Sequence, residues 1–109
     1  MPELPEVETT VKSLNILKNK KVINVDIHIK KLRYLVPHLD LKKIINYKIT
    51  NLRRIAKYII IDFDNIKSVI IHLGMSGRLK IVQHNIVLKK HDHLVFRFNK
   101  LTLIFNDRT

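Results

Sequence analysis

The chain has 109 residues, of which 46% are hydrophobic, so it is long enough and apolar enough to form one domain with a hydrophobic core. Its 21 lysines and arginines outnumber its 9 aspartates and glutamates, and the formal net charge of +12 predicts a surface that attracts phosphate, as in nucleic-acid-binding, ribosomal and membrane-surface proteins. It contains no cysteine, which excludes disulfides and thiolate zinc sites, and no apolar run approaches the roughly 20 residues of a membrane-spanning helix.

The first predicted element is an amphipathic helix. Pro5 stands at a plausible first helical position, and Val7, Val11 and Leu14 follow with helical spacing until about Leu17. The acidic start of the chain lacks the charged and then apolar layout of a secretory signal, so we expect a cytoplasmic protein.

Short strands are predicted for most of the remaining chain. Residues 23–29 alternate apolar and polar side chains with a period of two, which is typical of a half-buried strand. A helical turn is predicted over 39–45, turns at 64–65 and 99–100, and strands over 49–55, 58–63, 69–73, 79–82, 94–98 and 101–105. This order predicts an α+β, mostly β fold: a two-layer β-sandwich with the N-terminal amphipathic helix packed alongside. No linker divides residues 1–109, so we expect one domain.

The N-terminus is the first candidate for chemistry. Removal of the initiator methionine would leave the secondary amine of Pro2 beside the carboxylate of Glu3. An α-amino group has a pKa of about 7.7 to 8.0, against about 10.4 for lysine, so more of it is nucleophilic near neutral pH. Such an amine attacks an aldehyde-like carbon to give an iminium, and Glu3 and Glu6 are placed to move protons around it. In the structural alternative Pro5 begins a helix whose positive N-terminus is offset by Glu3, Glu6 and Glu8.

Four blocks of the sequence resemble a known family. In chain order they are 2–9 (PELPEVET), 53–58 (RRIAKY), 71–77 (IHLGMSG) and 90–93 (KHDH). With these blocks the chain resembles the bacterial formamidopyrimidine-DNA glycosylases, which excise oxidised purines such as 8-oxoguanine. The resemblance implies the same sandwich and a base-excision-repair DNA glycosylase and abasic-site lyase, which acts through a Schiff base at the N-terminal proline and then by β-elimination.

The resemblance also implies roles for the candidate catalytic residues. Pro2 would attack the glycosidic carbon of a nucleotide rotated out of the duplex. Glu3 would supply the proton for opening of the sugar ring, and Glu6 would be a supporting acid. Lys57 would be the proton donor of β-elimination, although its spacing alone is typical of a solvated lysine at a strand edge.

Several further residues are candidates for contact with DNA. Gly74 and Gly77 permit a tight turn that projects Met75, and an apolar side chain presented in this way can enter the gap left by an extruded base. The alternative is that Met75 folds back onto the core. The resemblance makes His72 a phosphate contact. Arg53 and Arg54 are either contacts to backbone phosphates or ordinary surface charge.

The segment His91-Asp92-His93 invites a metal interpretation, because residues at i and i+2 share one face of a strand. No third ligand is well placed, so we predict no metal site. The resemblance instead makes His91 a DNA contact and leaves Asp92 and His93 to brace the local loop.

Residues 105–109 resemble the opening of a fifth block, one residue short after Asp107. Arg108 would correspond to the arginine that reads the cytosine opposite the lesion. The family's helix-two-turn-helix module and zinc finger would follow, so the resemblance implies a domain that is incomplete at its C-terminal end and holds no cofactor. We expect a monomer that binds damaged double-stranded DNA and no membrane, with the missing half supplied by another polypeptide as one option.

Three hypotheses from different classes stay open at this point. The chain is a glycosylase and lyase domain that uses Pro2, Glu3 and Lys57, or a truncated, non-catalytic remnant of one. In the third hypothesis it is a basic nucleic-acid-binding domain that binds intact and damaged nucleic acid equally well.

Overall fold

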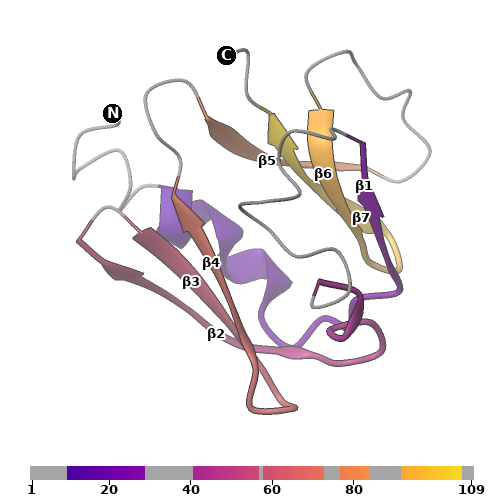
Figure 1. Ribbon diagram of the computed structural model, residues 1–109, viewed down its shortest axis with the longest axis horizontal. Coiled ribbons are helices and arrows are strands. Elements are labelled where there is room, and N and C mark those ends of the chain that lie inside the picture. The colour runs from indigo at the N-terminus through magenta and orange to yellow at the C-terminus, as the bar shows by residue number, and fades with distance from the viewer. Residues whose placement is uncertain (1–9, 29–40, 57, 73–76, 84–91, 107–109) are drawn as a thin grey trace.

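Two antiparallel sheets make up most of the part of the chain that the structure describes. The computed structural model describes residues 10–28, 41–56, 58–72, 77–83 and 92–106 (Figure 1). The strands are β1 (Asn24–Ile27), β2 (Ile49–Ile55), β3 (Tyr58–Phe63), β4 (Ser68–His72), β5 (Arg78–Gln83), β6 (Asp92–Arg97) and β7 (Leu101–Asn106). One sheet has the order β1-β6-β7-β5 and the other the order β2-β3-β4.

A short helix precedes the sheets. Residues 10–14 are α-helical and continue into the 3₁₀ helix η1 (Asn15–Leu17). Its buried side chains recur every three residues: Val11, Leu14 and Leu17. One stripe of the helix therefore faces the core. The chain leaves the helix through Asn19, whose φ of 70° is left-handed and whose N–H donates to the Ile49 carbonyl oxygen at 2.7 Å.

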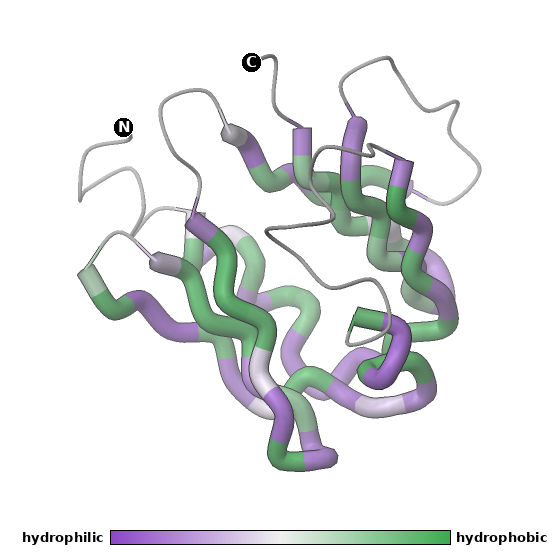
Figure 2. The backbone as a smooth tube through the Cα atoms, viewed as in Figure 1, coloured by the Kyte–Doolittle hydropathy of each residue, from purple (hydrophilic) through white to green (hydrophobic). Residues whose placement is uncertain are grey.

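The core lies between the two sheets and the helical stripe. Strands β3 and β4 carry runs of apolar residues, which Figure 2 shows as continuous green stretches. Core side chains of the smaller sheet include Ile59, Ile61 and Phe63, and those of the larger sheet include Leu94, Phe96, Leu103 and Phe105. Burial of these apolar side chains is the main force that holds the two sheets together.

The two sheets differ on their outer faces. On the larger sheet Val95 and Ile104 are cross-strand partners that point away from the core, yet both have 0% exposure. On the smaller sheet Ile70 also points outward, and it is 64% exposed. The larger sheet is therefore buried on both faces along β6 and β7, whereas the outer face of the smaller sheet is exposed at Ile70, although its cross-strand partner Ile60 is buried.

The predicted fold class is confirmed: the chain is mostly β, with two antiparallel sheets and a short N-terminal helix. The strands predicted over 49–55 and 58–63 have these bounds in the structure. β4 to β7 each differ from the prediction by one or two residues at one or both ends. Where a strand is longer than predicted, polar end residues such as Arg78 and Asn106 join the backbone ladder. Of the helical turn predicted over 39–45, residues 41–42 are helical and turns follow.

The helix start predicted over 5–9 lies outside the described residues. Of the strand predicted over 23–29, β1 covers Asn24–Ile27, Ile23 and His28 are not in the strand, and residue 29 lies outside the described residues. Within the described ranges, no helix is both long enough and apolar enough to cross a membrane.

Candidate nucleic-acid interface

The described residues that flank the sequence-predicted site residues lie at one end of the sandwich. In the smaller sheet Ile55 pairs with Tyr58, which pairs with His72. In the larger sheet the corresponding end row is Arg78, Asn106 and Asp92. Both rows lie at the upper end of the sandwich in Figure 1. We call this end the motif end.

Most of the predicted site residues themselves lie outside the described residues, and their roles stay predictions: Pro2, Glu3, Glu6, Lys57, Met75, His91 and Arg108. Their neighbours in the sequence are placed. Lys57 stands between the paired ends of β2 and β3, Met75 between the end of β4 and the start of β5, and His91 directly before β6.

The connection from β2 to β3 consists of two residues, Ala56 and Lys57. Ala56 has a φ of 51°, in the left-handed region that a two-residue hairpin turn requires and that a side chain with a Cβ resists. The strain is of order 1 kcal/mol, and strained residues of this kind cluster at functional sites. The Arg54 guanidinium donates to the Ala56 carbonyl oxygen at 2.9 Å and so holds the turn. Arg54, predicted as a phosphate contact or surface charge, is half-buried and braces the turn before Lys57.

His72 is exposed at the end of β4, directly before the 73–76 segment. Its ring lies against that of Tyr58, with 4.8 Å between the ring centroids and 34° between the planes. Tyr58 is 44% exposed and Ile55 beside it 54%. The smaller sheet therefore presents an imidazole, a phenol and an isoleucine side by side at the motif end.

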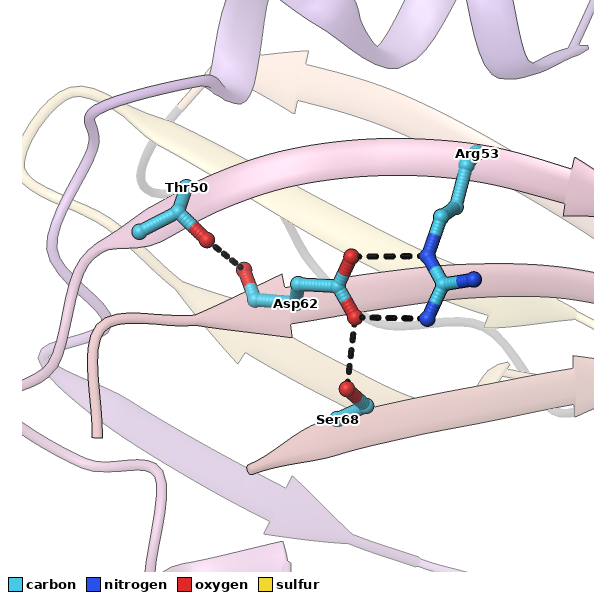
Figure 3. Close-up of polar contacts among 4 residues, drawn as sticks. All are labelled: Thr50, Arg53, Asp62 and Ser68. Atoms are coloured by element: carbon cyan, nitrogen blue, oxygen red, sulfur yellow. Dashed lines mark hydrogen bonds and ion pairs between the residues drawn. The ribbon is translucent and has the colours of Figure 1, made fainter. Parts of the chain in front are cut away.

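Arg53 lies on the outer face of the smaller sheet and binds a carboxylate of the same face (Figure 3). Its Nε and Nη2 donate to the two Asp62 carboxylate oxygens at 2.8 and 3.3 Å, and the Ser68 hydroxyl donates to the same carboxylate at 2.5 Å. The hydrogen bond from Arg53 holds the pKa of Asp62 below its usual value, and the Ser68 hydroxyl adds to this effect while partial burial opposes it. The same hydrogen bond raises the pKa of Arg53.

This ion pair affects the predicted contact of Arg53 with a backbone phosphate. A phosphate at Arg53 would have to compete with Asp62 for the planar fork of the guanidinium. The sequence analysis did not identify Asp62 or Ser68, because the register of β3 and β4 brings them beside Arg53 and no local spacing signals it. The contact of Arg53 with phosphate stays a prediction.

Asp92 is the buried carboxylate of the motif end. Its side chain is 1% exposed, accepts a hydrogen bond from the Asn106 amide at 2.8 Å and lies 4.0 Å from the Lys80 Nζ. The contact joins the start of β6 to the end of β7, one residue after His91 and two before Arg108. We infer that Asp92 fixes the points at which the chain leaves the sheet toward both candidate DNA contacts.

Asp92 and His93, which we expected to brace the local loop, both belong to strand β6, and the bracing role stays a prediction. The pairing with β7 shifts between Asp92 and Leu94, so His93 stands at a bulge. Its ring is buried, 6.5 Å from that of Phe105. A bulge changes the direction of the strand, and proteins use bulges to aim side chains next to functional sites. Among the described residues no group of three His, Cys, Asp or Glu side chains is arranged to hold a metal ion.

The structure defines a small β sandwich in which the described residues of the blocks 53–58, 71–77 and 90–93 lie toward one end. Comparison with known proteins assigns its class. The chain belongs to the formamidopyrimidine-DNA glycosylase N-terminal domain family, whose model matches residues 1–109. It is 48% identical over 109 residues to the formamidopyrimidine-DNA glycosylase of Rickettsia canadensis and 50% identical to that of Rickettsia bellii. In both cases the match covers 98% of this chain and 40% of the relative. The chain thus spans about two fifths of the length of the curated relatives it matches.

Solved structures agree with this family. The Lactococcus lactis FPG (MutM) in complex with FAPY-dG-containing DNA superposes with a TM-score of 0.90 at 31% identity, over 96% of this chain and 40% of that one. MutM in complex with DNA that contains carbocyclic 8-oxo-G gives a TM-score of 0.91 at 31% identity, over 98% of this chain and 41% of that one. The L. lactis Fpg bound to abasic-site DNA gives 0.91 at 30% identity, over 98% and 40%.

Proposed function

We propose that this chain is the nucleophile-bearing domain of a base-excision-repair DNA glycosylase and abasic-site lyase that acts on oxidised purines in double-stranded DNA. The observation that carries the proposal is the family match over residues 1–109, joined to TM-scores of about 0.9 with proteins solved on lesion-containing DNA. The arrangement of the strands supports it, because the neighbours of Lys57, Met75 and His91 meet at one end of the sandwich.

The proposed chemistry begins with the amine of Pro2. Its lone pair attacks C1′ of the extruded nucleotide, the bond from C1′ to the base breaks, and the departing base nitrogen takes up a proton. The amine nitrogen loses its own proton. Glu3 then donates a proton to the ring oxygen as the bond from C1′ to that oxygen opens, and the nitrogen lone pair forms the iminium. Glu6 supports this proton transfer.

The lyase step follows from the iminium. Loss of a proton from C2′ sends electrons toward the iminium and makes the 3′ oxygen a leaving group, so the bond from C3′ to that oxygen breaks. Lys57 takes the role of proton donor in this elimination. The turn residue Ala56, which directly precedes Lys57 in the sequence, is held by Arg54.

DNA recognition is proposed for the remaining predicted residues. Met75 fills the gap that the extruded base leaves, and Arg108 contacts the orphaned cytosine. His72, Arg53 and His91 contact phosphates and so fix the register of the protein on the duplex. The exposed imidazole of His72 supports this role, whereas Arg53 has to exchange its bond with Asp62 for one with phosphate.

The decisive experiment is reductive trapping on DNA that carries an abasic site, because this substrate needs no base excision. Borohydride should convert the iminium into a stable adduct between the processed chain and DNA. Pro2→Gly should reduce the adduct to background, whereas Pro37→Gly serves as the matched proline control and should leave it unchanged. Equal trapping by a form that retains the initiator methionine would exclude the N-terminal amine as the nucleophile.

Excision of 8-oxoguanine tests the more demanding step with the same 109-residue chain. We expect Glu3→Gln to slow single-turnover excision by about 10²-fold or more, the usual effect of losing a general acid, and Glu8→Gln to have little effect. We also expect excision by this chain to be much weaker than trapping, because extrusion of a paired base costs a few kcal/mol more. Efficient trapping without any excision would show that the chain forms the iminium at an abasic site but does not remove the damaged base.

A further inference from the structure

The end of the sandwich opposite the motif end carries an unusual concentration of lysine. The segment from residue 18 to 21 crosses this end between the two sheets and is fixed by backbone hydrogen bonds. Lys20 donates its N–H to the Leu17 carbonyl oxygen at 3.0 Å and accepts from the Ile49 N–H at 3.0 Å, and Ile23 donates to the Arg97 carbonyl oxygen at 2.7 Å. Leu17 and Val22 on either side have 0% exposure, so the segment is anchored in the core.

We name this region the basic end. Its exposed lysines are Lys18, Lys20, Lys21, Lys48 and Lys100. None of their ammonium groups has a hydrogen bond or an ion pair within the portion of the chain that the structure describes. Asp64 is nearby, but it accepts the backbone N–H of Lys48 at 3.0 Å and pairs with no lysine ammonium.

The arrangement of these charges is costly to the fold. Lys21 and Lys48 face each other across an antiparallel bridge, where opposite charges stabilise and like charges destabilise the pair. Several cations elsewhere in the fold have partners: Arg53 binds Asp62, Arg97 binds Asp26, and the Lys42 Nζ donates to the Val25 carbonyl oxygen. The basic end therefore concentrates positive charge that no side chain among the described residues pairs with.

A hollow of about 410 Å³ lies within the basic end. Lys20 and Lys100 line it together with Asn99, and Phe98 and Leu101 supply its apolar part. Phe98 is 2% exposed, so its ring is not free to stack on a base. Two cations and a carboxamide around an apolar surface suit a phosphate group and its attached sugar.

The basic end is separate from the motif end. The six-residue strand β3 runs between them, and a strand of this length spans about 20 Å. The Debye length at physiological salt is about 8 Å, so the two ends act on solvent ions independently of each other. The described part of the molecule extends over 32 × 27 × 27 Å, which leaves room for one DNA segment at each end.

We propose that the basic end binds the phosphodiester backbone of a second segment of double-stranded DNA, independently of sequence and of damage. Lys20 and Lys100 hold one phosphate at the hollow, and Lys18, Lys21 and Lys48 contact neighbouring phosphates. Under the proposed function the motif end already binds one DNA segment, so the claim that the basic end binds another segment rests on that function. The inference goes beyond that function, because it gives the protein a way to stay on undamaged DNA while the motif end samples another segment.

The salt dependence of binding to an undamaged duplex tests the basic end directly. Each phosphate contact contributes about 0.9 to the slope of log Kobs against log salt concentration, so Lys20→Gln/Lys100→Gln, which loses the one phosphate held at the hollow, should lower the slope by about 0.9. Lys12→Gln removes a charge from the exposed face of the helix, away from the basic end. It is the matched control for the single variants Lys20→Gln and Lys100→Gln. Thermal unfolding should be unchanged in all of them, because the substituted side chains are exposed.

Stoichiometry with short duplexes tests whether the segment is a second one. Sedimentation at low salt should show one duplex more per wild-type chain than per Lys20→Gln/Lys100→Gln chain. An unchanged slope in the double variant, or an equal fall in Lys12→Gln, would overturn the proposal. Tighter binding of phosphatidylglycerol vesicles or of single-stranded RNA than of duplex, lost in the double variant, would overturn the assignment to DNA. If trapping at Pro2 fails while the slope falls as expected, the proposed function is wrong and the basic end stands.

Discussion

Asp62 on the smaller sheet and Asp92 on the larger sheet both accept hydrogen bonds from neighbouring strands, but their surroundings differ. The Asp62 side chain is 22% exposed and binds Arg53 on the open face. The Asp92 side chain is 1% exposed and binds Asn106 where the sheet meets the motif end. Water screens the exposed pair, so it contributes little to folding, whereas a buried carboxylate is costly to separate from its partners. The smaller sheet is thus open to exchange partners, and the larger sheet is fixed.

The outer faces of the two sheets support the same distinction. Ile104 is fully buried on the outer face of the larger sheet, while Ile70 is mostly exposed on that of the smaller sheet. A surface that contacts and releases DNA needs exposed side chains such as Ile70. The framework that positions them needs buried side chains such as Ile104. Three predictions test this contrast.

The largest effect is expected from the two outer isoleucines. Ile104→Ala should destabilise the fold by about 2 to 5 kcal/mol, because it removes buried methyl groups and leaves a cavity. Ile70→Ala should change the free energy of unfolding by no more than about 0.5 kcal/mol, because the side chain is already in water. Urea unfolding of the two variants beside the wild type measures the difference. Equal losses would show that the smaller sheet is not open on this face.

A smaller effect is expected from the two carboxylates. Asp92→Asn should cost about 1.5 to 3 kcal/mol, the usual value for a hydrogen bond to a buried charged group. It should also weaken binding to a duplex with an abasic-site analogue more than the loss of stability explains, because the start of β6 and the end of β7 are no longer held together. Asp62→Asn should cost less than half as much stability. If Asp62→Asn proved the more damaging change, the exposed ion pair and not the buried carboxylate would organise the fold.

The smallest effect is the contribution of Asp62 to the pH dependence of stability. Arg53 lowers the pKa of Asp62 in the folded protein, so folding is favoured while Asp62 is ionised. This contribution is complete above the ordinary carboxyl pKa of about 3.9 and is lost as the pH falls through the lowered folded-state pKa. The difference in unfolding free energy between wild type and Asp62→Asn should therefore be constant near neutral pH and shrink under acid conditions. Chemical unfolding over a pH series measures it, and a difference that grows in acid would contradict the assignment.

The sequence alone predicted the local elements well. Residues 49–55 and 58–63 carry their strand signal within their own length, because they contain the β-branched and aromatic residue types that favour strands. The four sequence blocks predicted the family, since they depend on residue types at fixed spacing and on no tertiary contact. The same local information assigned Arg53 to a charged face and His72 to a strand end.

The tertiary structure decided what those side chains touch. β1 pairs with β6 about seventy positions later in the chain, and only this pairing places Arg97 against Asp26. The bond between Arg53 and Asp62, the burial of Asp92 beside Asn106 and the gathering of Lys20 with Lys100 likewise join distant segments. Residue propensity and periodicity indicate the backbone conformation of a residue and whether its side chain faces the core or the solvent. The residues that it contacts are fixed by the register of strands that meet only when the chain folds.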